Sequence, residues 1–196
     1  MKNIFKYIPL MVAFGIISFS SALYAQTAYK IADSKNNNMK LSGTSTLHDW
    51  TMNAQVFSSD AQFVLAAHQL RSVKALTFSL AVADLKSGES GLDKNAYKAL
   101  KASDNKNITY KLSSATVSAE GNKFLIKTRG NLTIAGVTKE VMIDVHAVVN
   151  ADETITCTGS EKLNMTDYQV KPPKFMLGAM KTGDAITLDF TLVYKK

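Results

Sequence analysis

The sequence has few of the residues that cross-link small secreted domains or hold metal ions. Its single cysteine, Cys157, excludes an intramolecular disulfide. Its three histidines, His48, His68 and His146, form neither an H-x-x-x-H motif nor a Cys/His spacing, which argues against a zinc site. We therefore expect neither a disulfide framework nor a bound metal ion.

Motifs of common catalytic and nucleotide-binding sites are also absent. The chain contains no G-x-G-x-x-G fingerprint and no P-loop, and the segment GESG at 88–91 is one residue short of a nucleophile elbow. His48 and Asp49 are adjacent, so on a strand they point to opposite faces and cannot act as a base with its orienting partner. We predict a protein that is not an enzyme and needs no cofactor; an enzyme using His48 and Asp49 is kept as an alternative.

Only one long apolar run is present, and it lies near the N-terminus. The stretch 8–19 follows two lysines, precedes a series of small residues, and is too short to span a bilayer, for which about 20 residues are needed. This layout is typical of a secretory signal peptide. We expect residues 1–25 to be a signal peptide, with cleavage after Ala25 or, alternatively, after Ala22. The mature chain, 26–196, is then one soluble domain in the periplasm or outside the cell.

Positive charge exceeds negative charge, and the formal net charge is +7. A basic excess favours anionic partners such as lipid headgroups, including transient contact with a membrane surface. No cluster of arginines interleaved with aromatic residues occurs, so we do not expect a nucleic-acid partner. A solvated basic surface that aids solubility explains the charge equally well.

The strongest pattern in the chain is a pair of alternating arms in 124–149. Successive side chains of a strand point to opposite faces, and the apolar residues of both arms fall on one phase. Ala135-Gly136 interrupts the alternation and predicts a tight turn. The apolar phase contains Phe124, Ile126, Leu132 and Ile134 on the first arm and Val137, Val141, Ile143, Val145, Ala147 and Val149 on the second.

Similar alternation recurs along most of the chain and predicts an all-β protein, either a barrel or a sandwich. One segment has helical spacing instead, and we predict a helix over 92–101. Ser90 and Asp93 have the Ser-x-x-acid spacing that is typical of a helix start. Cys157 shares a face with Ile155, so we expect a buried thiol. The further predicted strands are Ala28–Ala32, Met39–Thr46, Trp50–Phe57, Ala61–Leu70, Val73–Val82, 108–112, Thr154–Met165 and 186–194.

Three blocks of the chain, in order, resemble the YceI-like family of periplasmic barrels that bind polyisoprenoid lipids. They are LDKNAYKALKASDNKNITYKLSSATV at 92–117, the hairpin LTIAGVTKEVMIDV at 132–145, and GSEKLNMTDYQV at 159–170 with GDAITLDFTLVY at 183–194. The chain departs from the family pattern at GTSTLHDWTM, 43–52, which indicates a divergent branch. The resemblance implies a lipocalin-like antiparallel β-barrel of about eight strands with one short helix over 26–196.

The resemblance also implies a function, which is to hold a long apolar ligand, a polyisoprenoid or an isoprenoid quinone, inside the barrel. The alternative is a non-enzymatic periplasmic stress or interaction module with a filled core. The oligomeric state is left open. The predicted headgroup contacts are His48, Lys139, Lys171 and Lys174. The predicted lining residues are Trp50, Met52, Phe78, Leu80, Tyr110, Ile126, Leu132, Val141, Ile143, Leu188 and Phe190.

Overall fold

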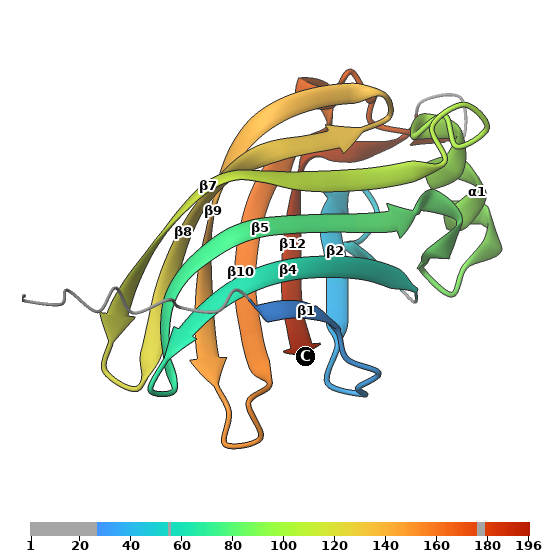
Figure 1. Cartoon of the computed structure of the whole chain (residues 1–196). Helices are drawn as coiled ribbons and strands as arrows, with labels where there is room; N and C mark the ends of the chain where they lie inside the picture. Colours follow the sequence, from blue (N-terminus) through green and yellow to red (C-terminus); the bar gives the residue numbers. More distant parts are fainter. Residues whose placement is uncertain (1–26, 55, 176–178) are drawn as a thin grey trace, which may run out of the picture.

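Eight antiparallel strands form a closed ring in the computed structural model (Figure 1), which describes residues 27–54, 56–175 and 179–196. The predicted all-β barrel with one short helix, α1 (Ser90–Ala99), is confirmed. The predicted signal peptide lies outside the described residues. In order around the ring, the strands are β1 (Thr27–Ile31), β4 (Phe57–Ala66), β5 (Gln69–Ala81), β7 (Asn107–Glu120), β8 (Lys123–Ile134), β9 (Val137–Val149), β10 (Ile155–Asn164) and β12 (Met180–Lys195).

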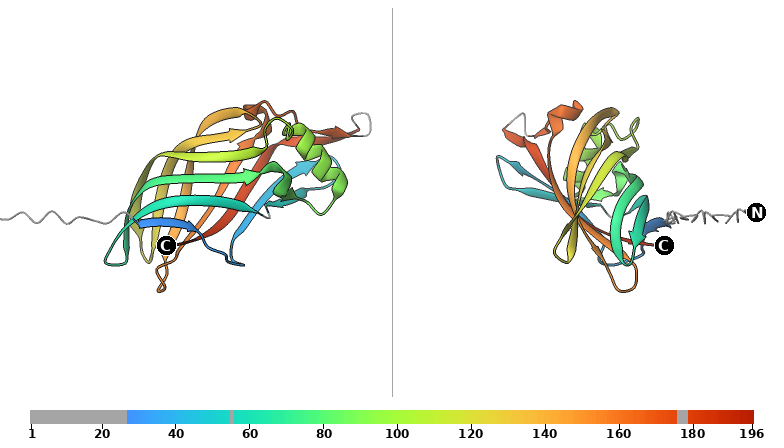
Figure 2. Two further views of the ribbon diagram at one scale, coloured as in Figure 1. Left: turned by 45° about the vertical axis from the view of Figure 1, so that its right-hand side comes forward. Right: turned by 60° about the vertical axis from the view of Figure 1, so that its left-hand side comes forward.

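The ring is closed at one end and forked at the other, because β12 changes its neighbour along its length. Its last residues pair with β1, through Tyr194 with Ile31, whereas the stretch 182–191 pairs with β2 (Asn38–Ser45). From β2 the sheet continues away from the ring through β3 (Trp50–Ala54) and β6 (Leu85–Lys86). This branch and α1 lie at the same end of the barrel (Figure 2), which we call the forked end.

Three short elements complete the chain. The 3-10 turn η1 (Val82–Asp84) connects β5 to β6, and η2 (Met165–Tyr168) follows β10. The two-residue strand β11 (Lys174–Phe175) pairs with the start of β12. Within the described part of the chain, no helix is both long enough and apolar enough to cross a membrane.

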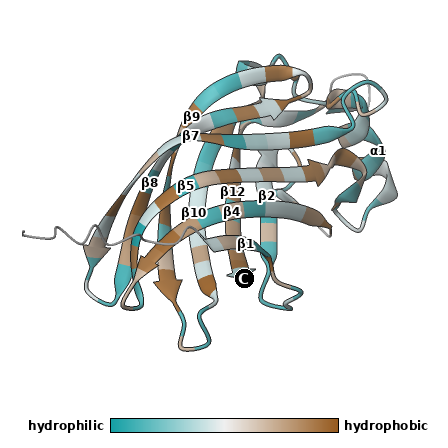
Figure 3. Ribbon diagram, viewed as in Figure 1, coloured by the Kyte–Doolittle hydropathy of each residue, from teal (hydrophilic) through white to brown (hydrophobic). Residues whose placement is uncertain are grey.

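The strands of the ring bury one face and expose the other, as the alternation predicts. Hydrophobic and hydrophilic residues alternate along several of them in Figure 3. On β8, for example, Phe124, Ile126 and Leu132 are buried while Lys123 and Lys127 are exposed. The turn between β8 and β9 is where the sequence predicts it, with positive φ at both Ala135 and Gly136. These two angles are the combination that a tight hairpin turn requires.

An aromatic cluster fills the closed end, which is the end opposite to the forked end. Phe63 makes edge-to-face contacts with Tyr29 and Tyr194, each with ring centroids 5.3 Å apart. The buried Ser59 hydroxyl donates to the Thr77 carbonyl (2.7 Å) and accepts from the Tyr194 hydroxyl (2.8 Å). Since these residues come from β1, β4 and β12, the cluster holds together the strands that close the ring.

Three inward-facing aromatic rings lie over glycines of neighbouring strands. Trp50 covers Gly43, Tyr110 covers Gly130, and Phe190 covers Gly159; in each case a Cβ on the glycine would collide with the ring. The absent side chain thus lets each ring lie flat against the barrel wall instead of projecting into the interior. These contacts preserve space inside the barrel.

Two predicted strands are wrong in their limits. The segment Ala61–Leu70, predicted as one strand, contains the turn between β4 and β5, which Ala67 and His68 make with positive φ although neither is a glycine. The strand predicted at Trp50–Phe57 ends at Ala54, and Phe57 begins β4.

The helix begins at Ser90, but the predicted Ser90–Asp93 capping contact is not formed. The Asp93 carboxylate does not bond to Ser90; it accepts hydrogen bonds from the Ser87 amide (2.8 Å) and hydroxyl (2.7 Å). The Ser87 hydroxyl oxygen in turn accepts from the Glu89 amide (3.0 Å), so the turn before the helix is fixed three residues earlier than the pattern indicates.

We predict that Gly159→Ala destabilises the protein by about 1–3 kcal/mol, because the new methyl group must displace the Phe190 ring. Equilibrium urea unfolding measures the change. Gly91→Ala is the matched control, since a Cβ at this helical position meets no atom within 4 Å and should be neutral or slightly stabilising. Equal stability of the two variants would contradict the proposed packing.

Candidate functional site

The interior of the barrel contains a cavity of about 190 Å³, which we call the inner cavity. Its wall comes from seven strands of the ring, from β2 and β6, and from Leu100 at the end of α1, and it is almost entirely apolar. The chain places the side chains of the strands there because each lies on the inward phase of its strand. They include Phe78, Leu80, Tyr110, Ile126, Leu132, Ile143, Leu188 and Phe190.

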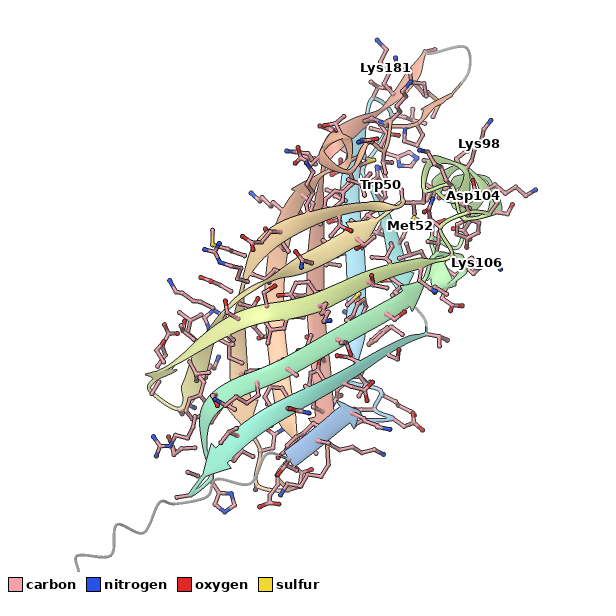
Figure 4. The ribbon with its side chains drawn as sticks, turned by 45° about the horizontal axis from the view of Figure 1, so that its top comes forward. Trp50, Met52, Lys98, Asp104, Lys106 and Lys181 are labelled. Carbon is pink, nitrogen blue, oxygen red and sulfur yellow. The ribbon has the colours of Figure 1, made fainter. Side chains whose placement is uncertain are left out.

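A second cavity of about 380 Å³, the outer cavity, opens at the forked end. Trp50 and Met52 of β3 line it (Figure 4), together with residues of β2, α1, η2 and β12. Its volume falls in the range of about 300–1,000 Å³ that is usual for small-molecule sites. The two cavities are contiguous, because both are lined by Leu41, Leu85, Leu100, Ile134 and Ile186.

The helix α1 covers part of the outer cavity without being embedded in the core. None of its residues is buried, but Leu92, Ala96 and Ala99 face the cavity. The Tyr97 side chain hydrogen-bonds the helix to η1 and β6: its hydroxyl lies 3.0 Å from the Ala83 carbonyl and 2.8 Å from the Leu85 carbonyl. The same hydroxyl accepts from Lys86 Nζ (2.9 Å).

Most of the residues predicted to line a ligand site do line one of the cavities; whether they contact a ligand stays a prediction. Val141 is the exception. It packs against a cluster that contains Tyr168 and Val170, because the chain after η2 covers this part of β9. The sequence offers little signal for that cover, since η2 is a single short turn.

The predicted headgroup residues are more scattered. His48 lines the outer cavity, where its Nδ1 lies 2.7 Å from the Asp49 carbonyl oxygen. Lys139, Lys171 and Lys174 are exposed and lie outside the lining of both cavities. Lys139 occupies the inward phase of β9 but is close to the tip of the β8–β9 hairpin, beyond the wall of the cavity.

Few polar groups face the inner cavity, and two of them, on Tyr110 and Thr128, form hydrogen bonds within the protein. The Tyr110 hydroxyl donates to Thr128 Oγ1 (3.2 Å), which donates to the Ile143 carbonyl (2.9 Å). Burial raises the pKa of Tyr110, and the bond to Thr128 partly offsets this effect. The other polar groups include Cys157 and Glu161. The predicted burial of Cys157 is confirmed, and burial raises the pKa of its thiol to about 12.

Sequence reasoning missed several residues of the site. Leu92, Ala96, Ala99 and Leu100 have a visible signal, because their helical spacing gives the helix an apolar side. Glu161 shares the phase of Cys157 and Leu163, so the alternation places this carboxyl inside the barrel. Among the described residues, no group of three histidine, cysteine, aspartate or glutamate side chains is arranged to hold a metal ion.

The fold and the cavities together define an antiparallel β-barrel with an apolar interior that opens at one end. The model of the family described as YceI-like domain matches residues 26–194. This match covers most of the chain, and the protein therefore belongs to the YceI-like family.

Solved structures show the same fold at low sequence identity. A polyisoprenoid-binding domain from Saccharophagus degradans, described as implicated in plant cell wall breakdown, is 13% identical with a TM-score of 0.65, covering 85% of this chain and 97% of that chain. Burkholderia cenocepacia BcnA is 20% identical with a TM-score of 0.63, covering 79% and 95%. The Campylobacter jejuni YceI protein is 20% identical with a TM-score of 0.58, covering 74% and 84%. No match was found among curated proteins.

We predict that thiol reagents label Cys157 far more slowly in buffer than in denaturant. The reactive form is the thiolate, and the raised pKa keeps the thiol protonated at neutral pH while the barrel wall blocks access. Labelling followed by mass spectrometry gives both rates. Equal rates in the two conditions would show that the inner cavity admits the reagent freely.

Proposed function

We propose that this protein is an exported carrier that holds one long apolar molecule, a polyisoprenoid or an isoprenoid quinone, inside the barrel. The observation that carries the proposal is the pair of contiguous cavities. Together they extend from the barrel interior to the forked end, and of the described residues that line them none is a lysine or an arginine. Family membership supports the proposal, as does the fold that the chain shares with the Saccharophagus polyisoprenoid-binding domain.

The binding energy in this proposal comes from the tail of the ligand. Burial of apolar surface contributes about 25 cal/mol per Å², so a prenyl chain can bind tightly without a charged anchor. At the closed end, the aromatic cluster is buried and leaves no room for the ligand. A prenyl tail that enters from the forked end therefore exchanges water for the apolar walls of both cavities.

The alternative of a filled core, which would make the protein an interaction module without a ligand, is less consistent with the cavities. A well-packed core leaves few voids larger than a water molecule. The inner and outer cavities exceed that size, and the three rings that lie flat over glycines keep them open.

The forked end also provides a surface for transient contact with an anionic membrane. Leu47, at the turn between β2 and β3, is 65% exposed. The next strand edge carries lysines: Lys181, whose carbonyl accepts from the Thr46 amide (3.0 Å), pairs in register with the exposed Lys174. An exposed leucine beside lysines suits an interface of apolar chains and anionic headgroups, and it stands next to the opening through which a lipid would pass.

We predict that gentle organic extraction of the purified protein yields a prenyl lipid, identified by mass spectrometry, and that Leu132→Trp reduces its amount. Leu132 is 7% exposed and lines the inner cavity, so a larger ring there occupies the space of the ligand. Met142→Trp is the matched control, because Met142 is 67% exposed on the outer face of β9. An empty wild-type protein that binds no added prenyl lipid would rule out the carrier.

We also predict export, with the mature chain beginning at Gln26. The basic, apolar and small-residue layout of 1–25 is the reason. N-terminal sequencing of the protein from its native host is the measurement. A chain that retains Met1 there would contradict both the cleavage and the exported location.

A further inference from the structure

One carboxyl group lies where an apolar side chain is expected. Glu161 of β10 occupies the inward phase, between Gly159 and Leu163, and lines the inner cavity. Of the described residues that line this cavity, it alone carries a formal charge at neutral pH. The ion pairs in the described part of the chain join other residues: Arg129 with Glu140, His146 with Glu120, and Lys196 with Glu153.

At Glu161 the strands β9 and β10 of the barrel wall separate from each other. Strands β9 and β10 are paired only from Val149 with Ile155 to Val145 with Gly159, so Glu161 lies just beyond the last paired residue. The segment that begins with η2 crosses this part of the wall. Tyr168 of this segment packs in a cluster with Tyr110, Leu132 and Ala135, all from the other side of the separation.

Tyr168 brings a second unsatisfied polar group to the neighbouring outer cavity. Its side chain is 3% exposed and lines the outer cavity, and its hydroxyl has no hydrogen-bond partner among the described residues. A buried hydroxyl without a partner has lost the hydrogen bonds that it makes to water in the unfolded chain. The Tyr29 hydroxyl is also buried without a partner among the described residues, but it lies in the aromatic cluster, outside the lining of both cavities.

The pKa shifts of Glu161 and Tyr168 agree with the absence, within the described part of the chain, of a hydrogen-bond or ion-pair partner for either side chain. Burial raises the pKa of Glu161, and the nearby Asp144 raises it further. Burial also raises the pKa of Tyr168, to about 12, with smaller contributions from Asp167 and from Glu161 itself. The Glu161 contribution agrees with the geometry, in which Tyr168 packs across the separation that Glu161 borders.

We propose that Glu161 and Tyr168 form a selector for the polar end of the ligand, which accepts a neutral hydroxyl group and disfavours an anionic phosphate. This inference rests on the proposed function and names the ligand class for the same site. A hydroxyl group is both donor and acceptor: it donates to the Glu161 carboxylate and accepts from the Tyr168 hydroxyl, directly or through a water molecule. A phosphate can only accept, and it meets the carboxylate as a like charge at low dielectric.

The test compares two probes with the same tail, geranylgeraniol and geranylgeranyl monophosphate. The single tryptophan of the chain, Trp50, lines the outer cavity, so its fluorescence reports binding of both. The wild type should favour the alcohol by about tenfold or more, since juxtaposed like charges cost at least about 1.4 kcal/mol. A geranylgeranyl hydroquinone, tested in parallel, distinguishes a phenolic from an alcoholic hydroxyl group as the natural source.

Variants then assign the preference to the selector. Glu161→Gln keeps the size and an acceptor oxygen while removing the charge, so it should retain alcohol binding and bring the affinity for the phosphate close to that for the alcohol. Asp189→Asn is the control, because it removes a like charge from the exposed face of the adjacent strand and should leave the ratio unchanged. Tyr168→Phe removes only the hydroxyl and should weaken alcohol binding by about fivefold, as expected for one hydrogen bond of about 1 kcal/mol.

The outcomes separate this inference from the carrier function. Binding of neither probe to the wild type overturns both. Binding of the two probes with equal affinity, or with the phosphate preferred, leaves the carrier intact and overturns the selector. A preference for the alcohol that Glu161→Gln leaves unchanged also overturns it.

Discussion

The architecture of this protein depends on β12 changing partners along its length. A strand has two edges, and one edge of β12 pairs with β10 throughout β10's length. The other edge pairs with β2 and then, near the C-terminus, with β1, with an irregularity in the β2 pairing between Thr182 and Ile186. Because two different strands occupy the same edge, the wall must divide between them. One end is then sealed by β1 and its aromatic neighbours, and the other end is left open.

The cavities follow from this division and from how bulky residues are accommodated. Aromatic side chains normally fill the interior of an eight-stranded barrel, which is just wide enough to be occupied by side chains or by one small ligand. Here Trp50, Tyr110 and Phe190 are placed over glycines, so their area stabilises the wall while the centre stays free. Polar side chains in such an interior are costly unless they are paired. The Tyr110–Thr128 pair forms its hydrogen bonds within the protein, so its burial costs little, whereas Glu161 and Tyr168 lack such partners among the described residues.

The sequence predicted the parts of the fold that depend on period-two alternation. The 124–149 hairpin and its turn at Ala135-Gly136 are where the pattern places them, and the same phase led to most of the cavity wall. Features without a periodic signal were missed: the Ala67-His68 turn uses left-handed backbone angles that are uncommon for residues other than glycine, and η2 depends on tertiary packing of Tyr168. The lysines Lys139, Lys171 and Lys174 were predicted as headgroup contacts from their position near strand ends. That position does not determine whether a side chain faces inward.

The way α1 is attached has a kinetic consequence. The helix contributes no fully buried residue. It is held by the Tyr97 hydroxyl, by the Asp93–Ser87 hydrogen bonds and by Leu92 and Ala96, which are only partly buried against the core. The closed end, by contrast, is held by three buried aromatic rings. Partial opening at α1 is therefore a local event of low free-energy cost, whereas opening at the other end requires global unfolding. In the proposed carrier, the residence time of a guest and the melting temperature of the barrel therefore depend on different parts of the molecule.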